Sequence, residues 1–361
     1  MSSADAFPHH AEQIDAVWLT QALRRSGALQ EATVTAVDAR PVGNGLLGES
    51  IRFALQYDRP EPGAPEAVVA KFGSRNESSR AMAAATKIYL REIRFYEEIA
   101  PHIATRTPRT HFTAISGDDI DFILLMEDLS PARGGNQLEG CSVEDCRIAV
   151  QEIAGLHAKH WGDPSLQQIP WLQGREPVIA RQEQMLPAIA QAYRERYAGL
   201  LAPEMLSVLD RFVPLYGRMA RDRQSPQTLV HGDFRLDNVL FDVHGRLGTM
   251  ATLDWQTTHI GAALFDVAFF LGGSLPVDER RTHEQDLVRH YLDVLQQAGV
   301  KDYGWEACWR DYRRFACRSI VTAVIAPMGV ERTARGDQMF MKMMQDHCQQ
   351  LIDLDALALW S

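Results

Sequence analysis

The stretches that decide the fold are LVHGDFRLDNVLF at residues 229–241 and TLDWQ at residues 252–256. In the first, a short apolar strand leads into an HGD triplet that ends at Asp233, and Asn238 follows five residues later. In the second, another apolar strand ends at Asp254, sixteen residues beyond Asn238. A loop between two short strands is expected to bring these three side chains close together.

This set of side chains matches what phosphoryl transfer from ATP requires. A carboxylate must orient the attacking hydroxyl and accept its proton, while an amide oxygen and a second carboxylate hold Mg²⁺ against the phosphates. The alternative is an acidic surface turn, because a lone HxD or DxxxxN occurs often by chance. The order His, Asp, Asn, Asp, with a strand at each expected point, favours the catalytic interpretation.

A glycine string, GNGLLG, places Gly43, Gly45 and Gly48 where backbone amides could approach phosphates without a Cβ in the way. A Rossmann dinucleotide site uses the same letters, and Glu66, eighteen residues past Gly48, is near where a ribose-binding acid would lie. A Rossmann loop opens a helix, however, whereas Ser50–Tyr57 alternates with period two and indicates a returning strand. We therefore favour a phosphate flap in a hairpin over a dinucleotide site or a purely structural turn.

Lys71 follows a buried, β-branched run in AVVAKFGS, which is an unusual place for a solvent-facing lysine. We expect its ammonium to bind the α- and β-phosphates and to be positioned by a helix glutamate. The candidates in YLREIRFYEEIA are Glu92, Glu97 and Glu98. Glu92 lies one turn before Tyr96, so both can share the inner face, and we choose it; the alternative is that all three are solvated helix charges.

The segment FILLMEDL at residues 122–129 is an apolar strand that turns abruptly acidic. In a two-lobed kinase an adenine ring would rest there, bonded to backbone amide and carbonyl groups near Glu127 and Leu129. The alternative is a core strand that ends in a surface turn.

Periodicity indicates a strand-rich first third and a helix-rich remainder, hence an α+β, two-lobed protein. We expect helices over 11–26, 78–99 and 143–161, and strands over 33–42, 50–57, 67–72, 109–115, 122–126, 228–230, 239–241 and 249–253. Residues 1–128 would form a lobe with a leading helix, the flap and the phosphate-binding lysine. Residues 129–361 would form a helical lobe with the catalytic loop, the metal site and an acceptor pocket.

Composition limits the classes of partner. The net charge of −10 argues against nucleic acid, and 46% hydrophobic residues suffice for a sizeable core. The five cysteines show no CxxC pair and no zinc spacing, as expected of reduced thiols in a cytosolic protein. The N-terminus lacks the features of a signal peptide, and no apolar run is long enough to span a bilayer. We expect a cytoplasmic protein with no membrane association and no obligate protein partner.

The string HGDFRLDN resembles the catalytic-loop motif of the aminoglycoside phosphotransferase and choline kinase superfamily, and LDW resembles its metal-binding aspartate. The strings REIRFY, LLMEDL and GLHAKHW are most similar to the ecdysteroid-kinase-like branch and its bacterial relatives. The resemblance runs from the flap through at least Leu271. It implies a protein-kinase-like fold with a small β-rich N-lobe and a larger, mostly helical C-lobe. It also implies ATP and Mg²⁺ as cofactors and a small-molecule hydroxyl as acceptor.

The resemblance implies residue roles as well. Asp233 would be the catalytic base, and Asn238 and Asp254 would hold magnesium. Lys71 would grip the phosphates and pair with Glu92. In addition, the imidazole of the HGD triplet, His231, would brace the loop, and Asp266 in FDVAFFL would be a buried, loop-supporting acid.

Two departures from protein kinases stand out. Asp254 is followed by Trp255-Gln256 rather than Phe-Gly, so that style of switching is not implied. Arg235 stands two residues after Asp233, where protein kinases place a lysine. It either neutralises the transferring phosphoryl group or packs as a loop cation.

The acceptor is not specified by the sequence. The segments 157–161, 259–260 and 305–315 mix aromatic side chains with His, Arg and Asp, and they are candidates to line the acceptor pocket. A plain helix core explains the aromatic spacing at 305, 309 and 312 better. Outside the catalytic loop there is no dense acidic cluster of the kind that an aminoglycoside would require, which favours a less cationic, partly apolar acceptor. A nucleotide-binding pseudo-kinase and, further off, a nicotinamide-dependent oxidoreductase stay open as alternatives.

Overall fold

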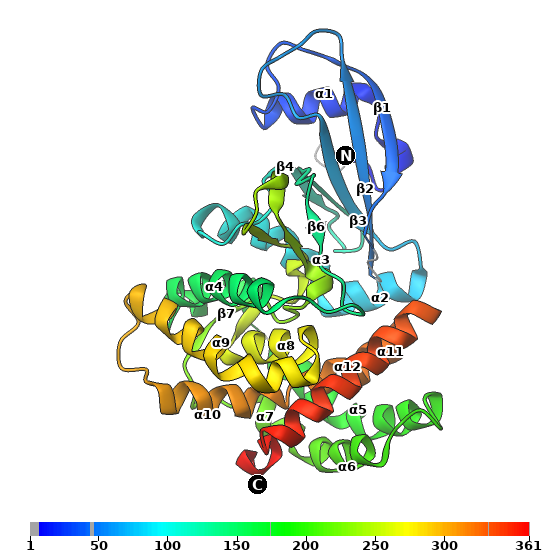
Figure 1. Ribbon diagram of the computed structural model, residues 1–361. Helices are drawn as coiled ribbons and strands as arrows, with labels where there is room; N and C mark the ends of the chain where they lie inside the picture. The colour runs from blue at the N-terminus through cyan, green and yellow to red at the C-terminus, as the bar shows by residue number, and fades with distance from the viewer. Residues whose placement is uncertain (1–6, 44–46, 174, 331, 361) are drawn as a thin grey trace. The chain divides into compact units, whose positions relative to one another are not determined.

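A computed structural model describes residues 7–43, 47–173, 175–330 and 332–360 (Figure 1). The chain forms two compact units, an N-terminal unit of Met1–His102 with Thr107–Ala132 and a C-terminal unit of Ile103–Arg106 with Arg133–Ser361. The expectation that residues 1–128 bind phosphates and that residues 129–361 hold the catalytic loop, the metal site and the acceptor pocket stays a prediction.

The N-terminal unit is built on an antiparallel sheet of order β1-β2-β3-β5-β4. Its strands are β1 (Val34–Pro41), β2 (Gly48–Tyr57), β3 (Ala67–Gly73), β4 (Thr110–Ile115) and β5 (Phe122–Glu127). One face of the sheet packs on a core that includes Leu19 and Leu23 of the first α-helix and the alternate β3 residues Val68, Ala70 and Phe72. Because successive strand side chains point to opposite faces, Lys71 of β3 lies on the other face.

The helical segments of this unit depart from the prediction. They are η1 (Ala11–Gln13), α1 (Ala16–Arg25), α2 (Glu77–Thr86), α3 (Ile88–Arg94), the π-helical η2 (Phe95–Ile99) and η3 (Ala100–His102). A single helix over 78–99 was wrong, because Lys87 adopts a left-handed conformation with φ 54° and ends α2. The predicted helix over 11–26 likewise divides into η1 and α1.

Two small sheets hold the loops of the C-terminal unit. The strands are β6 (Arg133–Gly134), β7 (Gln227–Val230), β8 (Val239–Phe241), β9 (Met250–Thr252) and β10 (His259–Ala262). β7 pairs with β10, and β8 lies between β6 and β9, all antiparallel. The three strands predicted near residues 228, 239 and 250 are confirmed. Strands β6 and β10 were not predicted, because neither has an apolar alternation long enough to indicate a strand.

The rest of this unit is helical. Its α-helices are α4 (Val143–Lys159), α5 (Arg175–Arg196), α6 (Pro203–Phe212), α7 (Tyr216–Ala220), α8 (Leu264–Ser274), α9 (Val277–Gln297), α10 (Trp305–Ala316), α11 (Ser319–Gly329) and α12 (Ala334–Asp353). Short turns complete it: η4 (Pro164–Gln168), η5 (Pro170–Leu172), η6 (Val213–Leu215), η7 (Leu236–Asn238), η8 (Val243–Gly245), η9 (Trp255–Thr257) and η10 (Ala356–Trp360). None of the helices in the described ranges combines the length and apolar composition that a membrane crossing requires.

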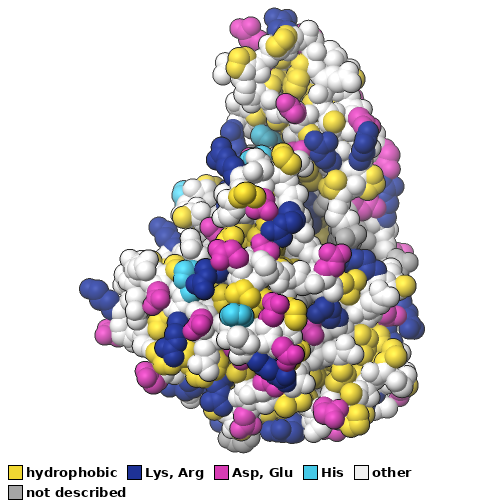
Figure 2. Space-filling model, viewed as in Figure 1, with side chains coloured by type: hydrophobic (Ala, Val, Ile, Leu, Met, Phe, Trp, Pro, Cys, Tyr) yellow, Lys and Arg dark blue, Asp and Glu magenta, His cyan; other side chains and the backbone are white. Residues whose placement is uncertain are grey.

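Helix α8 is the centre of the C-terminal unit. All eleven of its residues are buried, and it packs against α4, α9, α10 and α12 (Figure 1). A helix that is apolar on all sides must be covered on all sides, which explains this position. By contrast, basic and acidic side chains are interspersed on the surface that Figure 2 shows, as on an ordinary solvated face.

Two glycines of α8 let α12 approach closely. A Cβ on Gly272 would lie 2.1 Å from Gln350 Oε1, and one on Gly273 would lie 3.3 Å from His347 Nε2. His347 is buried and stacks on Phe269 with the ring centroids 5.2 Å apart. The contact therefore places an imidazole inside the apolar core.

We predict that His347 makes folding depend on pH. Burial lowers the pKa of His347 from 6.5 to about 4. Below pH 6.5 the unfolded chain therefore binds a proton that the folded chain does not take up until the pH nears 4, so the free energy of unfolding falls across this window. Between pH 7 and pH 5 this one group should cost about 2 kcal/mol of stability.

Denaturant unfolding of the wild type and of His347→Gln at both pH values measures this effect. The loss of stability on acidification should be smaller in the variant by about 2 kcal/mol. An equal loss in both proteins would show that His347 is not the titrating group.

Candidate active site

The loop after β7 is anchored by a buried carboxylate. Asp266 on α8 is fully buried, and its Oδ2 and Oδ1 accept hydrogen bonds from the amides of His231 at 2.7 Å and Gly232 at 2.9 Å. His157 Nε2 lies 3.3 Å from the same Oδ2. The expectation that Asp266 is a buried, loop-supporting acid is thereby confirmed.

His231 joins the two halves of the loop. Its Nδ1 accepts the amide of Asp233 at 3.2 Å, and its Nε2 lies 2.9 Å from the carbonyl oxygen of Leu253. Because a carbonyl only accepts, Nε2 carries the proton in this arrangement. The imidazole therefore braces the loop, as expected, and ties Asp233 to the residue that precedes Asp254.

Gly232 is required by its backbone. Its φ is +84°, and a Cβ there would lie 2.6 Å from the carbonyl oxygen of Thr257. Any side chain would therefore move the loop on which Asp233 stands.

The β8–β9 hairpin brings Asn238 and Asp254 to the same end. Val239 pairs with Thr252, and the amide of Leu253 donates to the carbonyl of Asn238 at 2.8 Å. Asp254 then turns out of the strand with φ 60°, a left-handed conformation that is uncommon for residues other than glycine.

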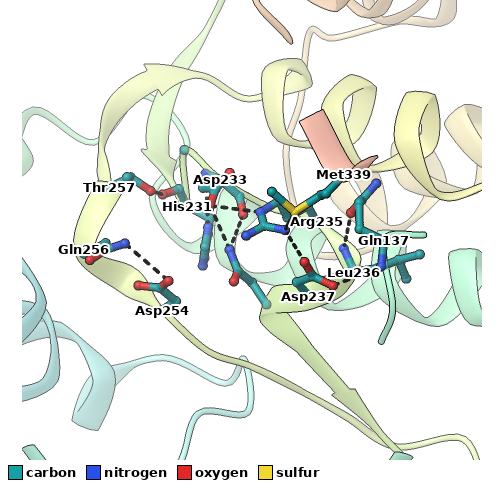
Figure 3. Close-up of polar contacts among 12 residues, drawn as sticks. Gln137, His231, Asp233, Arg235, Leu236, Asp237, Asp254, Gln256, Thr257 and Met339 are labelled. Carbon is teal, nitrogen blue, oxygen red and sulfur yellow. Dashed lines mark hydrogen bonds and ion pairs between the residues drawn. The ribbon is translucent and has the colours of Figure 1, made fainter. Parts of the chain in front are cut away.

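Asn238 is fixed against Asp233. Its Nδ2 donates to the carbonyl oxygen of Asp233 at 2.8 Å and to Oδ2 at 2.9 Å. The amide nitrogen is therefore directed at the aspartate, and the amide oxygen is the atom that suits a cation. Figure 3 shows Asp233 and Asp254 in this region, and Asn238 is bonded to Asp233.

The donor set fits magnesium. Mg²⁺ is usually held through one or two protein carboxylates together with the substrate phosphates, and it prefers oxygen ligands. Asn238 and Asp254 supply one amide oxygen and one carboxylate. Within the described ranges no group of three or more His, Cys, Asp or Glu side chains is arranged to hold a metal ion.

Arg235 lies between two carboxylates (Figure 3). Its Nε is 3.2 Å from Asp233 Oδ2, and its Nη1 is 2.7 Å from Asp237 Oδ2. Burial raises the pKa of Asp233 and Asp254 raises it further, while Arg235 opposes both. Burial lowers the pKa of Arg235, but the two aspartates outweigh it and raise that pKa above its usual range. These contacts fit a loop cation, and the neutralisation of a transferring phosphoryl group by Arg235 stays a prediction.

In the N-terminal unit, Lys71 forms an ion pair with the buried carboxylate of Glu92. Lys71 Nζ lies 2.8 Å from both carboxylate oxygens of Glu92, whose side chain is 1% exposed. Glu97 instead accepts from Thr113, so Glu92 is the glutamate that faces the lysine. The binding of phosphates by Lys71 stays a prediction.

The glycine string lies in a hairpin. β1 and β2 pair antiparallel, and Ser50–Tyr57 is part of β2, so the Rossmann interpretation, which needs a helix there, is wrong. A Cβ on Gly48 would lie 2.8 Å from the carbonyl oxygen of Phe72, and Gly43 has φ +75°. Gly45 lies outside the described residues. Phosphate binding by this segment stays a prediction.

The predicted adenine contact near Glu127 and Leu129 stays a prediction, and the backbone amide of Glu127 has another partner. The amide of Glu127 donates to the carbonyl of Arg109 at 2.8 Å, and its carboxylate accepts the amide of Arg109. That amide is therefore engaged within β4–β5, and an adenine contact stays a prediction for the Glu127 carbonyl and for Leu129.

A comparison with protein families identifies the family of this chain. The model of the ecdysteroid kinase-like family matches residues 43–160 and 172–303. The chain belongs to this family. The resemblance seen in the HGDFRLDN and LDW motifs is thereby confirmed.

Solved structures show the same fold. Choline kinase from Cryptosporidium parvum is 12% identical, with a TM-score of 0.57 and coverage of 95% of this chain and 98% of that one. A Ralstonia eutropha protein assigned as an aminoglycoside phosphotransferase is 15% identical, with a TM-score of 0.54 and coverage of 94% and 97%. The α+β, protein-kinase-like fold is therefore confirmed.

One sequence relative is much longer than this chain. Acyl-CoA dehydrogenase family member 10 from Mus musculus is 30% identical over 126 residues, which cover 33% of this chain and 11% of that protein. The match thus involves about a tenth of the relative. The name of the relative therefore describes a protein most of which has no counterpart in the match.

The ecdysteroid kinase-like chain buries several residues that were candidates for its acceptor pocket. His157 is fully buried and bonds to Tyr291 and Asp266, so its predicted place in the acceptor pocket is wrong. Tyr312 and Phe315 are also buried, which confirms the core interpretation for Tyr312, whereas Trp305 and Trp309 are only half-buried.

Sequence reasoning missed Gln137. This side chain is buried, and its Oε1 accepts the amide of Leu236 at 3.1 Å (Figure 3). Its Nε2 donates to the carbonyl oxygen of Gly273 at 2.6 Å. The backbone amide of Gln137 donates to Asp237 Oδ1 at 3.0 Å. Gln137 thus ties the loop of residues 231–238 to α8, and it lies about a hundred residues before that loop in the sequence. A single glutamine in a loop gives no signal in the sequence.

We predict that Gln137 positions the loop. Gln137→Met keeps the length of the side chain and removes both of its hydrogen bonds, so Asp233 should lose its alignment. Displacements near 1 Å cost about 10²-fold in rate, and we expect that loss in kcat with little change in the KM for ATP. Gln345→Met, on the exposed side of α12, is the matched control. Equal kcat values for Gln137→Met and the wild type would contradict this role.

Proposed function

We propose that this protein is an ATP- and magnesium-dependent kinase that phosphorylates a hydroxyl group of a small molecule. The observation that carries the proposal is the bonded pair of Asp233 and Asn238 beside the hairpin end that holds Asp254. These residues have the chemistry that a base and a metal site for phosphoryl transfer require.

Asp233 would act on the acceptor. Its carboxylate orients the attacking hydroxyl and takes up the hydroxyl proton as the oxygen forms a bond to the γ-phosphorus. The bond from that phosphorus to the β,γ-bridging oxygen breaks, and ADP leaves with the electron pair. Burial raises the pKa of Asp233, which makes it a better base than an exposed aspartate.

Asn238 and Asp254 would hold Mg²⁺, which supplies positive charge against the phosphates during transfer. Lys71 would bind the α- and β-phosphates, since an ammonium held by a buried carboxylate is oriented in advance. The glycines of the β1–β2 turn would let backbone amides approach the same phosphates.

The acceptor is a small molecule in this proposal. The fold is that of kinases whose named substrates are choline and aminoglycosides, and those substrates belong to those proteins. A pseudo-kinase that binds nucleotide without transfer is the second candidate, and the presence of Asp233, Asn238, Asp254 and Lys71 argues against it.

We predict different losses for the two aspartates. Asp233→Asn keeps the shape of the side chain and the charge of the metal site, so binding of ATP with Mg²⁺ should survive while turnover falls by about 10²–10⁴-fold. Asp254→Asn removes a charge from a cation site, so it should weaken the binding of ATP with Mg²⁺ and make activity depend on a higher Mg²⁺ concentration.

Titration of both variants with ATP at several Mg²⁺ concentrations, followed by thermal shift and by ADP release with a panel of hydroxylated compounds, tests the proposal. At 100 times its Kd, a ligand adds about 2.7 kcal/mol of stability, so wild-type binding is readily seen. Binding of ATP with Mg²⁺ but no transfer to any acceptor would favour the pseudo-kinase. Loss of nucleotide binding in Asp233→Asn, with full activity in Asp254→Asn, would contradict the assigned roles.

A further inference from the structure

A second arginine reaches the catalytic loop from α12. Arg335 Nη2 lies 3.6 Å from Asp237 Oδ1, and Asp237 Oδ2 accepts Arg235 Nη1 at 2.7 Å. One helical turn further along the same face of α12, Met339 Sδ lies 3.5 Å from Arg235 Nη1 (Figure 3). Two guanidinium groups therefore share one carboxylate next to Asp233.

Arg335 is held more loosely than its basic neighbours. Arg332 and Arg196 both bind Asp337, at 2.7 Å and 2.8 Å. The contact of Arg335 is about 3.6 Å long, and its side chain is 38% exposed. A guanidinium at that distance from its carboxylate makes no hydrogen bond to it and keeps donors for another anion.

The helix itself does not explain an arginine at this position. Arg335 is the second residue of α12, and a cation in the first turn of a helix opposes the helix dipole. The side chain is instead directed to the loop, where it adds positive charge beside the proposed base. The contact with Asp237 in the loop therefore explains an arginine at this position better than the helix does.

The charges of this region disfavour a cationic acceptor. The carboxylates of Asp233 and Asp237 are already paired with Arg235, and Arg335 adds a further positive charge. An ammonium group placed here would meet two guanidinium groups, whereas a carboxylate or phosphate would gain charge-assisted hydrogen bonds in the paired geometry that arginine favours.

We propose, resting on the proposed kinase function, that the acceptor carries an anionic group that binds Arg335. The substrate class is then a hydroxylated acid, whose hydroxyl lies at Asp233 while its carboxylate or phosphate contacts the guanidinium. The transfer step is unchanged: the hydroxyl oxygen bonds to the γ-phosphorus, its proton passes to Asp233, and ADP leaves.

The test compares acceptors that differ only in charge. The series consists of ω-hydroxy acids of four to twelve carbons, their methyl esters, the matching ω-amino alcohols and the matching ω-hydroxyalkyl phosphates. For each, kcat and KM are measured with the wild type, Arg335→Gln, Arg335→Lys and the control Arg332→Gln, and binding is measured by thermal shift in the presence of ADP and Mg²⁺. Comparison of the hydroxy acids with the hydroxyalkyl phosphates shows whether the anionic group is a carboxylate or a phosphate.

We expect the acids or the phosphates to be preferred over the esters and amino alcohols. Arg335→Gln should raise the KM for the anionic acceptor by roughly 10- to 100-fold, as expected for a lost hydrogen bond to a charged group, with a smaller change in kcat and in the KM for the ester. Arg335→Lys should restore part of the loss, and Arg332→Gln should match the wild type.

Other outcomes overturn the inference. Preference for the esters or amino alcohols would do so, as would equal effects of Arg335→Gln on anionic and neutral acceptors, which would indicate that Arg335 only neutralises Asp237. Absence of any binding or phosphorylation of the anionic series would also overturn it. Failure of the wild type to bind ATP with Mg²⁺ would instead overturn the proposed function.

Discussion

The loop that carries the proposed catalytic residues depends on one buried carboxylate. Asp266 is the charged residue inside α8, a helix that is otherwise apolar and buried on all sides. Burying a charge is costly unless it is well bonded, and here two backbone amides and an imidazole surround the carboxylate. Removing it would leave the amides of His231 and Gly232 buried without a partner, which costs about 1–3 kcal/mol for each such group.

From this anchor the geometry of the site follows in short steps. The fixed amides set the direction of the chain at Gly232, where no Cβ can be accommodated. His231 then accepts the amide of Asp233 and donates to the carbonyl before Asp254, so the proposed base and the proposed metal ligand are braced by the same ring. The β8–β9 hairpin supplies the second connection between them. The loop is thus positioned from the core of its own unit.

Much of this arrangement could be predicted because it is local in the sequence. Asp233, Asn238 and Asp254 follow short apolar strands at fixed spacing, and Lys71 and Glu92 are recognised by an unusual lysine and by helix periodicity. The features that were missed depend on distant contacts or on single backbone angles. Gln137 acts through three hydrogen bonds to residues far along the chain, and the left-handed Lys87 that breaks α2 from α3 has no sequence signal.

The acceptor side could not be predicted for a related reason. Helical spacing does not distinguish a side chain that faces the core from one that faces a ligand, so His157 was assigned to a pocket although it bonds to Asp266 and Tyr291 within the core. Arg335 was passed over because its significance comes only from its nearness to Asp237.

Amide hydrogen exchange across residues 231–238 tests the central claim, that Asp266 holds this loop, most directly. In Asp266→Asn, an amide group replaces one acceptor oxygen with a donor that faces a backbone amide. Losing one bond to a charged group is worth roughly 1.5–3 kcal/mol, so exchange in this segment should be faster by about 10- to 100-fold than in the wild type, with no change in β1–β5. Unchanged exchange in residues 231–238 would contradict the account.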